Sequence, residues 1–161
     1  MLFDVDGVLT DGKLWYGANG ESLKAFHVLD GHGIKLLMQT GTTVALLSGR
    51  HSAAVTARAA ELGIGHVLQG IDDKKAAFEA LAAQLGVPAA ETGFMGDEVV
   101  DLPVLRRCGF ACAPAQAHEL VRAHAHYVTG MAGGEGAARE ACEFVLRAQG
   151  RLEGALARYL A

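Results

Sequence analysis

The sequence predicts an α/β protein with an open parallel sheet and crossover helices. Short apolar or β-branched segments alternate with helix-forming segments along most of the 161 residues, an order typical of parallel strands joined by helices. A chain of this length buries about 70% of the surface that its unfolded form exposes. We therefore expect a single domain over 1–161, with a hairpin at about 13–28 and a C-terminal tail at about 150–161.

Six segments rich in apolar or β-branched residues are expected to form strands. They are Leu2–Val5, Thr43–Leu47, His66–Leu68, Gly93–Met95, Phe110–Cys112 and Tyr127–Val128. Segments rich in Ala, Leu, Glu and Arg lie between turn-forming residues and are expected to form helices. They are Ala53–Leu62, Lys74–Leu85, Leu102–Arg107, His118–Ala123, Ala137–Leu146 and Leu152–Leu160. No internal repeat or inter-domain linker interrupts this order.

One segment departs from the alternation. Leu14–Tyr16 and Leu23–Val28 are both β-prone, and they flank the Gly-Ala-Asn-Gly turn signal of Gly17–Gly20. This predicts a β-hairpin just after the first strand. The first strand begins almost at Met1, so we expect a few residues ahead of it to be missing from this sequence.

Charge and composition exclude several classes of protein. The net charge is -4 and no Lys/Arg block is present, which argues against a nucleic-acid surface. The N-terminal apolar runs are short and are interrupted by Asp4 and Asp6, unlike a signal peptide or a membrane span. We expect a cytoplasmic protein whose partners are small molecules or sister subunits, with no nucleic acid and no membrane.

Polar residues stand where the predicted strands end. The first strand ends in Asp4-Val5-Asp6-Gly7, the next parallel strand in Ser48-Gly49-Arg50 and a later one in Gly96-Asp97-Glu98, while Lys74 follows a turn. Ligands of open α/β sheets bind outside the carboxyl ends of the strands. Each motif alone is usually a turn or a helix start, but their joint order at successive strand ends favours an active site.

The acidic residues at this rim indicate a metal. Asp4, Asp6, Asp97 and, beside them, Glu98 and Asp101 crowd negative charges that repel by about 1–4 kcal/mol per close pair. Carboxylates without His or Cys partners favour Mg²⁺, which keeps several waters and takes one or two carboxylates plus a phosphate oxygen. The sequence therefore predicts a magnesium site that a phosphate group completes.

The same residues suit a covalent phosphatase mechanism. Asp4 is the candidate nucleophile, because a carboxylate that attacks phosphorus splits one difficult displacement into two easier ones. Gly7 lets the chain turn, so that Asp6 reaches the leaving oxygen as general acid and base, a role that contributes about 10²–10⁴ in rate. Ser48 and Lys74 would neutralise charge on the phosphoryl oxygens.

A resemblance to a known superfamily supports this interpretation. Asp4-Val5-Asp6-Gly7-Val8, Ser48, Lys74 and Gly96-Asp97 resemble the four ordered motifs of haloacid dehalogenase-type phosphatases. A narrower likeness, to the family of 3-deoxy-D-manno-octulosonate 8-phosphate phosphatases of lipopolysaccharide biosynthesis, is carried by Leu23-Lys24-Ala25-Phe26, Asp30-Gly31, Leu68-Gln69-Gly70 and Ala132-Gly133-Gly134. It implies a capless Rossmann-like core and a homotetramer in which the hairpin flap helps to close a neighbour's active site.

The resemblance also implies a role for each matched residue. Asp4 would be the nucleophile and a metal ligand, Asp6 the acid/base and a backbone-carbonyl ligand, and Asp97 the second carboxylate ligand. The implied contacts to the sugar phosphate come from Asp6, His27, Val28, Leu29, Asp30, Gly31, Lys35, Ser48, Gly49, Arg50, Arg58 and Lys74. The cationic members of this set suit an acidic sugar that carries phosphate and carboxylate groups.

Two departures from the family pattern leave the sugar open. Glu98 stands where many relatives have Asp, and Glu135 stands where relatives often carry Arg in a glycine-rich loop. An acidic Glu135 would weaken binding of an anionic sugar or belong to a different subunit contact. A nonulosonate 9-phosphate is therefore the alternative substrate.

Two other classes of protein remain as alternatives. A phospho-accepting receiver domain has similar residues, but its acceptor Asp follows the acidic pair by a whole strand and helix. A non-catalytic scaffold, as in relatives fused to nucleotide-sugar synthetases, would not need the intact Asp4, Asp6, Lys74 and Asp97. The tail from Arg151 to Ala161 is either a helix on its own core or an arm that reaches a neighbour.

Overall fold

The computed structural model describes residues 1–160, apart from the side chains of residues 21 and 22. Its main sheet has six strands, and every neighbouring pair is parallel. In sheet order they are β5 (His66–Leu68), β4 (Ala45–Leu47), β1 (Leu2–Phe3), β6 (Gly93–Met95), β7 (Phe110–Ala113) and β8 (Tyr127–Val128). The predicted α/β fold with an open parallel sheet is confirmed.

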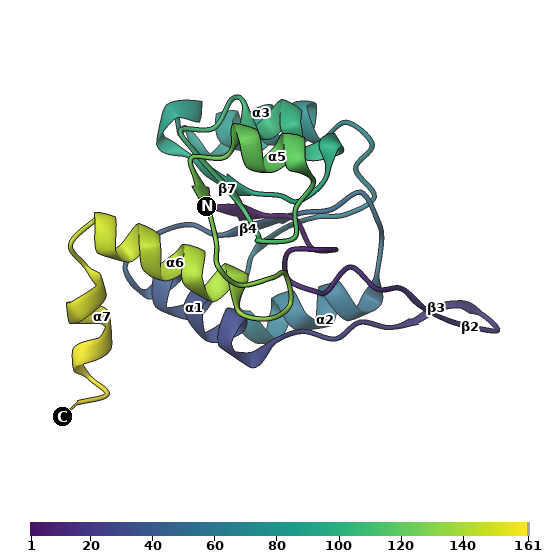
Figure 1. The fold of residues 1–161 in the computed structure, drawn as a ribbon, viewed down its shortest axis with the longest axis horizontal. Coiled ribbons are helices and arrows are strands. Elements are labelled where there is room, and N and C mark those ends of the chain that lie inside the picture. The colour runs from purple at the N-terminus through teal and green to yellow at the C-terminus, as the bar shows by residue number, and fades with distance from the viewer. Residues whose placement is uncertain (161) are drawn as a thin grey trace.

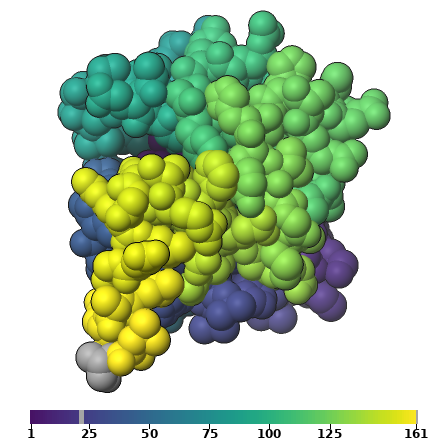
Figure 2. All heavy atoms as spheres, turned by 60° about the vertical axis from the view of Figure 1, so that its left-hand side comes forward, coloured from purple at the N-terminus to yellow at the C-terminus, as the bar shows by residue number. Residues whose placement is uncertain are grey.

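Helices cover both faces of this sheet (Figure 1). One face carries α1 (Val28–Gln39), α2 (Ala53–Leu62) and α6 (Ala137–Ala148), and the other carries α3 (Lys74–Leu85), α4 (Leu102–Leu105) and α5 (Glu119–His124). Two 3₁₀ segments, η1 (Ala89–Glu91) and η2 (Val99–Asp101), flank β6. Helix α7 (Leu152–Ala157) follows α6 at the C-terminal end of the chain (Figures 1 and 2), and its Leu152, Ala155 and Leu156 side chains pack against the core layer of α1 and α6. None of the helices within residues 1–160 combines the length and apolar character needed to cross a membrane.

The core lies in two layers, one on each face of the sheet. Leu2 and Phe3 are consecutive in β1, yet Leu2 packs in the layer with Phe78 of α3, and Phe3 packs in the layer with Leu37 of α1. Successive side chains of a strand point to opposite faces, so a central strand with helices on both sides must be apolar throughout. This explains why β1 is a continuous apolar run that ends at Asp4.

Helix α1 is an element that the sequence did not predict. Gly31 and Gly33 lie within it, and each lowers the intrinsic helix propensity by about 1 kcal/mol relative to Ala. Tertiary packing overrides this cost, because α1 packs along α6 and a Cβ atom at Gly33 would lie only 2.8 Å from the Cα of Arg139. The spacing of Ile34 and Leu37, both buried, was the available helical signal.

The hairpin is present, but its second strand was placed too late. Strand β2 (Trp15–Gly17) pairs antiparallel with β3 (Gly20–Leu23), so the predicted strand over Leu23–Val28 is wrong. A two-residue loop lets pairing resume at once after the turn. The chain then reaches His27, whose Nδ1 accepts from Leu29 N at 3.3 Å and caps α1.

Candidate active site

The predicted residues converge at the carboxyl end of β1. This strand lies between β4 and β6, and the chain first fills the β4 side of the sheet before it crosses back to β6. Such a reversal of strand order opens a crevice at the strand ends. Asp4 follows β1 and its N–H donates to Met95 O at 2.9 Å, which ties the loop after β1 to the end of β6.

Three carboxylates and one ammonium form the centre of this crevice. Oxygen atoms of Asp4, Asp97 and Asp101 lie within 4.8 Å of one another. Lys74 Nζ lies 2.7 Å from Asp4 Oδ2 and 2.7 Å from Asp101 Oδ1, and the Lys74 side chain is only 6% exposed. The centre therefore holds more negative than positive charge.

Asp101, which the sequence analysis placed among the acidic residues at the rim without a catalytic or ligand role, is a member of the site. Its Oδ2 accepts from Asp97 N at 3.0 Å and from Glu98 N at 3.2 Å, so one carboxylate holds both Lys74 and the loop that carries Asp97. Glu98 Oε1 in turn accepts from Val99 N at 2.6 Å, which completes a capping box at η2. The acidic pair at Glu98 and Asp101 was the sequence signal for this box.

Burial and mutual repulsion shift the titration of the carboxylates. Burial, with a further contribution from the Asp101 charge, raises the pKa of Asp4 to about 7 against the opposing effect of Lys74. Burial and the neighbouring Asp4 and Asp101 charges likewise raise the pKa of Asp97 to about 7. Burial opposes the charge of Lys74, but the two adjacent carboxylates raise its pKa overall.

These residues fit a hard divalent cation. Asp97 Oδ1 is buried and has no hydrogen-bond partner among residues 1–160, and a buried polar atom without a partner is costly. Asp4 and Asp97 offer oxygen ligands only, which suits Mg²⁺. Both residues would hold the ion at a point where the protein has surplus negative charge.

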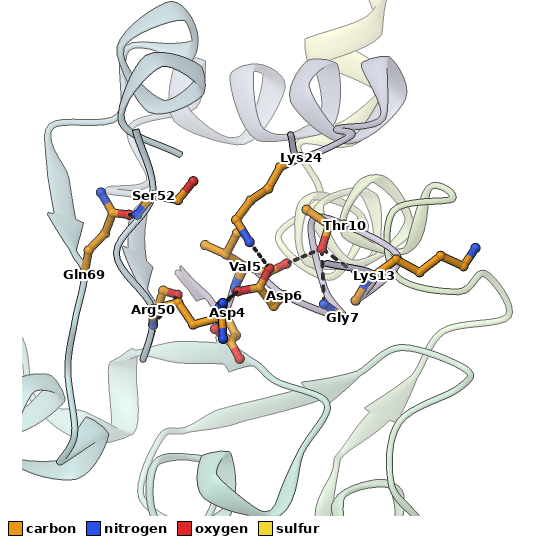
Figure 3. Close-up of polar contacts among 12 residues, drawn as sticks. Asp4, Val5, Asp6, Gly7, Thr10, Lys13, Lys24, Arg50, Ser52 and Gln69 are labelled. Atoms are coloured by element: carbon orange, nitrogen blue, oxygen red, sulfur yellow. Dashed lines mark hydrogen bonds and ion pairs between the residues drawn. The ribbon is translucent and has the colours of Figure 1, made fainter. Parts of the chain in front are cut away.

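Asp6 faces a different set of partners (Figure 3). Lys24 Nζ forms an ion pair with Asp6 Oδ1, and the Lys24 side chain is 1% exposed. Arg50 Nε lies 4.0 Å from Asp6 Oδ2, and Arg50 Nη2 donates to Tyr16 OH at 2.8 Å. The Asp6 side chain is thus held by cations outside the three-carboxylate centre. Lys24 and Tyr16, which connect this carboxylate to the hairpin, were not predicted as site residues, although Lys24 lies within a motif of the family.

Three of the predicted sugar contacts meet at the start of α1, and the others differ in burial. His27, Gly31 and Arg58 lie together at the start of α1, where Arg58 Nη2 donates to His27 O at 3.4 Å and would be 2.3 Å from a Cβ at Gly31. Val28, Leu29, Lys35 and Gly49 are exposed. Ser48 is buried, and its Oγ accepts from Arg50 N at 3.3 Å.

Asp30 has a structural partner already. Its carboxylate is buried and accepts from Gly136 N at 3.3 Å and Arg139 N at 2.8 Å, at the beginning of α6. Burial raises the pKa of Asp30, against the effect of these backbone hydrogen bonds. Its predicted sugar contact stays a prediction, to be weighed against this cap of α6.

Two cavities open beside these groups. One, of about 430 Å³, is lined by Lys24, Phe26, Val28, Ala54, Ala57, Arg58 and Glu61. The other, of about 240 Å³, is lined by Asp11, Ala25, Phe26, His27, Gly134 and Glu135. The second cavity places the unusual Glu135 beside the predicted sugar contact His27.

The raised carboxylate pKa values predict how Mg²⁺ stabilises the protein. Without metal, the folded-state pKa values of Asp4 and Asp97 are about 7, above the unfolded value of 3.8. The folded protein therefore binds more protons between about pH 4 and 7, and its free energy of unfolding falls as pH rises through this window. Mg²⁺ needs both carboxylates deprotonated, so it should raise the melting temperature more at about pH 7.5 than at about pH 5.5.

Thermal unfolding with and without Mg²⁺, at both pH values, measures this effect. The Asp97→Asn variant is the control and should lose most of the Mg²⁺ response at either pH. An equal Mg²⁺-induced rise in melting temperature at the two pH values would contradict the prediction.

Comparisons with known proteins agree with this geometry. The family model for haloacid dehalogenase-like hydrolases matches residues 66–140. The chain is 44% identical to the 3-deoxy-D-manno-octulosonate 8-phosphate phosphatase KdsC of Yersinia pestis over 155 residues. The aligned region covers 96% of this chain and 83% of the Yersinia protein.

Solved structures show the same relationship. A probable YrbI-family phosphatase from Pseudomonas syringae superimposes with a TM-score of 0.97 at 49% identity, covering 99% of this chain and 91% of that chain. The 3-deoxy-D-manno-octulosonate 8-phosphate phosphatase of Moraxella catarrhalis, in complex with magnesium, phosphate and KDO, superimposes with a TM-score of 0.95 at 41% identity, covering 98% and 91%. The chain belongs to the haloacid dehalogenase-like hydrolases, in the family of the 3-deoxy-D-manno-octulosonate 8-phosphate phosphatases.

Proposed function

We propose that this chain hydrolyses 3-deoxy-D-manno-octulosonate 8-phosphate to 3-deoxy-D-manno-octulosonate and phosphate, through an aspartyl-phosphate on Asp4, as a step of lipopolysaccharide biosynthesis. The observation that carries the proposal is the buried Asp4 carboxylate, fixed between Lys74 and the loop after β6. The Moraxella catarrhalis relative, which binds magnesium, phosphate and KDO, supports the same substrate class.

In the first step Asp4 attacks the phosphate ester. An Asp4 carboxylate oxygen bonds to phosphorus, the bond from phosphorus to the sugar oxygen breaks, and Asp6 gives its proton to that oxygen. The Asp4 side chain is held for this step, because Oδ1 accepts from Val5 N at 2.7 Å and Oδ2 contacts Lys74. Mg²⁺, when bound, offsets the carboxylate charges and stabilises charge on the phosphoryl oxygens.

In the second step water releases the phosphate. Asp6 takes a proton from water, the water oxygen bonds to phosphorus, and the bond from phosphorus to Asp4 breaks. The Asp6 side chain is 20% exposed and is ion-paired to Lys24, so this proton exchange would take place outside the three-carboxylate centre. Lys74 and Ser48 would neutralise the phosphoryl oxygens in both steps.

The alternative substrate is a nonulosonate 9-phosphate, and one feature favours keeping it. Glu135 lines the cavity that also contains His27 and Asp11, where the family pattern often has Arg. Asp11 at this wall is ion-paired to Lys13 at 2.9 Å, so Glu135 is the residue whose charge bears on how an acidic sugar is placed there. The phosphate chemistry at Asp4 would be the same for both sugars.

Phosphate release from a panel of substrates tests the proposal. The panel contains the octulosonate 8-phosphate, nonulosonate 9-phosphates and simple hexose phosphates, each with and without Mg²⁺. We expect the highest kcat/KM for the octulosonate 8-phosphate with Mg²⁺, and no release by Asp4→Asn. A hexose phosphate as best substrate would overturn the sugar assignment, and an active Asp4→Asn variant would overturn the mechanism.

Replacing the acid/base separates catalysis from metal binding. Asp6→Asn should lower kcat by about 10²–10⁴, because general acid–base help is lost. Its Mg²⁺ affinity should change far less, since the Asp6 carboxylate lies outside the three-carboxylate centre. Single-turnover kinetics and calorimetric titration with Mg²⁺ measure the two effects. Asp97→Asn is the matched control, for which the loss of Mg²⁺ affinity should dominate.

We further propose a homotetramer in which the hairpin flap contributes to a neighbour's active site. Trp15, Tyr16 and Leu23 of the hairpin are 57%, 63% and 65% exposed, and the hairpin projects from the body of the molecule (Figure 1). An apolar patch of this kind usually marks an interaction surface.

Light scattering measures the assembly directly. We expect a tetramer for the native sequence and smaller species for Trp15→Ser. A serine side chain cannot replace the apolar contact that the Trp15 indole would make with a neighbouring subunit in the proposed tetramer. Leu120→Ser on α5, where Leu120 is 48% exposed, is the control and should remain tetrameric. A monomeric native protein would contradict the proposed assembly.

A further inference from the structure

The turn after β7 contacts the loop that carries Asp97 and the glycine-rich segment 130–136. His118 N donates to Asp97 O at 2.8 Å, and Ala115 N donates to Met131 O at 3.1 Å. Between these two residues, Gln116 reaches across the crevice with both ends of its amide. The backbone of the turn thus contacts the Asp97 loop and the glycine-rich segment 130–136. The Gln116 side chain makes a further contact, to the loop that carries Asp4 and Asp6.

The Gln116 side chain is a second link between two backbones that also share the hydrogen bond from Gly134 N to Val8 O. Its Nε2 donates to Gly7 O at 2.7 Å, and its Oε1 accepts from Gly133 N at 2.8 Å. A Cβ atom at Gly133 would lie only 1.8 Å from Gly7 O. Only a glycine at position 133 leaves room for this close approach to the Gly7 peptide. The Gln116 amide, hydrogen-bonded to both, helps to fix the position of Gly133 relative to Gly7.

Gly7 is in direct contact with the metal carboxylate Asp97. A Cβ atom at Gly7 would lie 2.0 Å from Asp97 Oδ2 and 2.9 Å from Oδ1. Gly7 also has φ +84°, a conformation that glycine adopts at little cost. A shift of Gly7 would therefore change its contact with the Asp97 side chain. It would also move the carbonyl of Asp6, the preceding residue.

The glycine-rich segment on the other side of Gln116 is anchored to the loop after β1 and to helix α6. Gly134 N donates to Val8 O at 3.0 Å, and the carboxylate of Glu140 in α6 accepts from Gly130 N and Met131 N at 3.0 and 3.1 Å. The glycine-rich segment is therefore a fixed support rather than a free loop. Through the Gln116 amide, which accepts from Gly133 N and donates to Gly7 O, this support is connected to the loop that carries Asp4 and Asp6.

We propose that Gln116 is a positioning residue for magnesium: it holds the Gly7 peptide, and thereby the spacing between the Asp6 carbonyl and the Asp97 carboxylate. This inference rests on the proposed magnesium site but needs no assumption about the sugar. Groups that orient metal ligands from outside the coordination sphere typically change metal affinity by about 10–100-fold when they are replaced.

Calorimetric titration of the substrate-free protein with Mg²⁺ tests the role of Gln116. Gln116→Met keeps the length of the side chain and removes both hydrogen bonds, so Mg²⁺ affinity should fall by about tenfold or more. In phosphate-release assays the Mg²⁺ concentration for half-maximal activity should rise by the same factor, and KM at saturating Mg²⁺ should stay within about twofold.

Gln69→Met is the matched control. Gln69 also makes two hydrogen bonds, from Ser52 N at 2.8 Å and to Thr56 Oγ1 at 2.9 Å, but it binds the start of α2 and not the catalytic loop. Its Mg²⁺ affinity should equal that of the native protein. Should Gln116→Met fold poorly, Gln116→Asn keeps the amide and shortens the side chain by one methylene, and it should also bind Mg²⁺ more weakly.

Two results would overturn the inference. One is native Mg²⁺ affinity in both Gln116 variants. The other is a raised KM with unchanged Mg²⁺ affinity, which would make Gln116 a substrate contact. Failure of the substrate proposal alone would leave the titration result intact, because that measurement contains no sugar phosphate.

Discussion

The surplus of negative charge around Lys74 is the constraint on which the site depends. Asp4, Asp97 and Asp101 converge on a single ammonium group in a buried crevice, and burial makes this excess more costly than it would be in water. The carboxylates stay close together despite this repulsion, because backbone contacts hold the loops after β1 and β6 and the start of α3 in place. The same surplus makes a divalent cation the natural complement of Asp97 Oδ1, a buried oxygen without a hydrogen-bond partner among residues 1–160.

Charge also separates the two aspartates of the first motif. Asp4 lies in the three-carboxylate centre, whereas two residues later Asp6 lies beside Lys24 and Arg50. The turn at Gly7 produces this separation. One aspartate can therefore act on phosphorus while the other exchanges protons at the leaving oxygen, although both come from a single loop.

The sequence predicted the elements whose signals are local. The boundaries of α2, α3 and β6 follow from Ala-rich or apolar segments between turn residues, and Asp4, Lys74 and Asp97 follow from motifs at strand ends. It did not predict α1, because Gly31 and Gly33 lower the helix propensity of this segment. Packing against α6 stabilises the helix in the folded chain. The second strand of the hairpin was misplaced because β-prone residues continue past Leu23 to the cap at His27.

Contacts between distant segments account for the rest of what the sequence missed. Asp101 and Gln116 have ordinary local surroundings, and only the folded chain brings them to Lys74 and Gly7. Tyr16 in β2 and Lys24 just after β3 likewise gain their partners, Arg50 and Asp6, only in the folded chain. The periodicity of apolar residues along the chain does not indicate which distant residues will pair in this way.

The buried position of Asp30 limits how this protein can acquire a new substrate. A change at Asp30 would disturb the start of α6 as well as the predicted sugar site, since the carboxylate binds Gly136 N and Arg139 N. Glu135 is exposed and lies on the cavity wall without that structural duty. Replacing Glu135 should therefore disturb the fold less than replacing Asp30, so the wall of this cavity can change its charge while the start of α6 stays as it is.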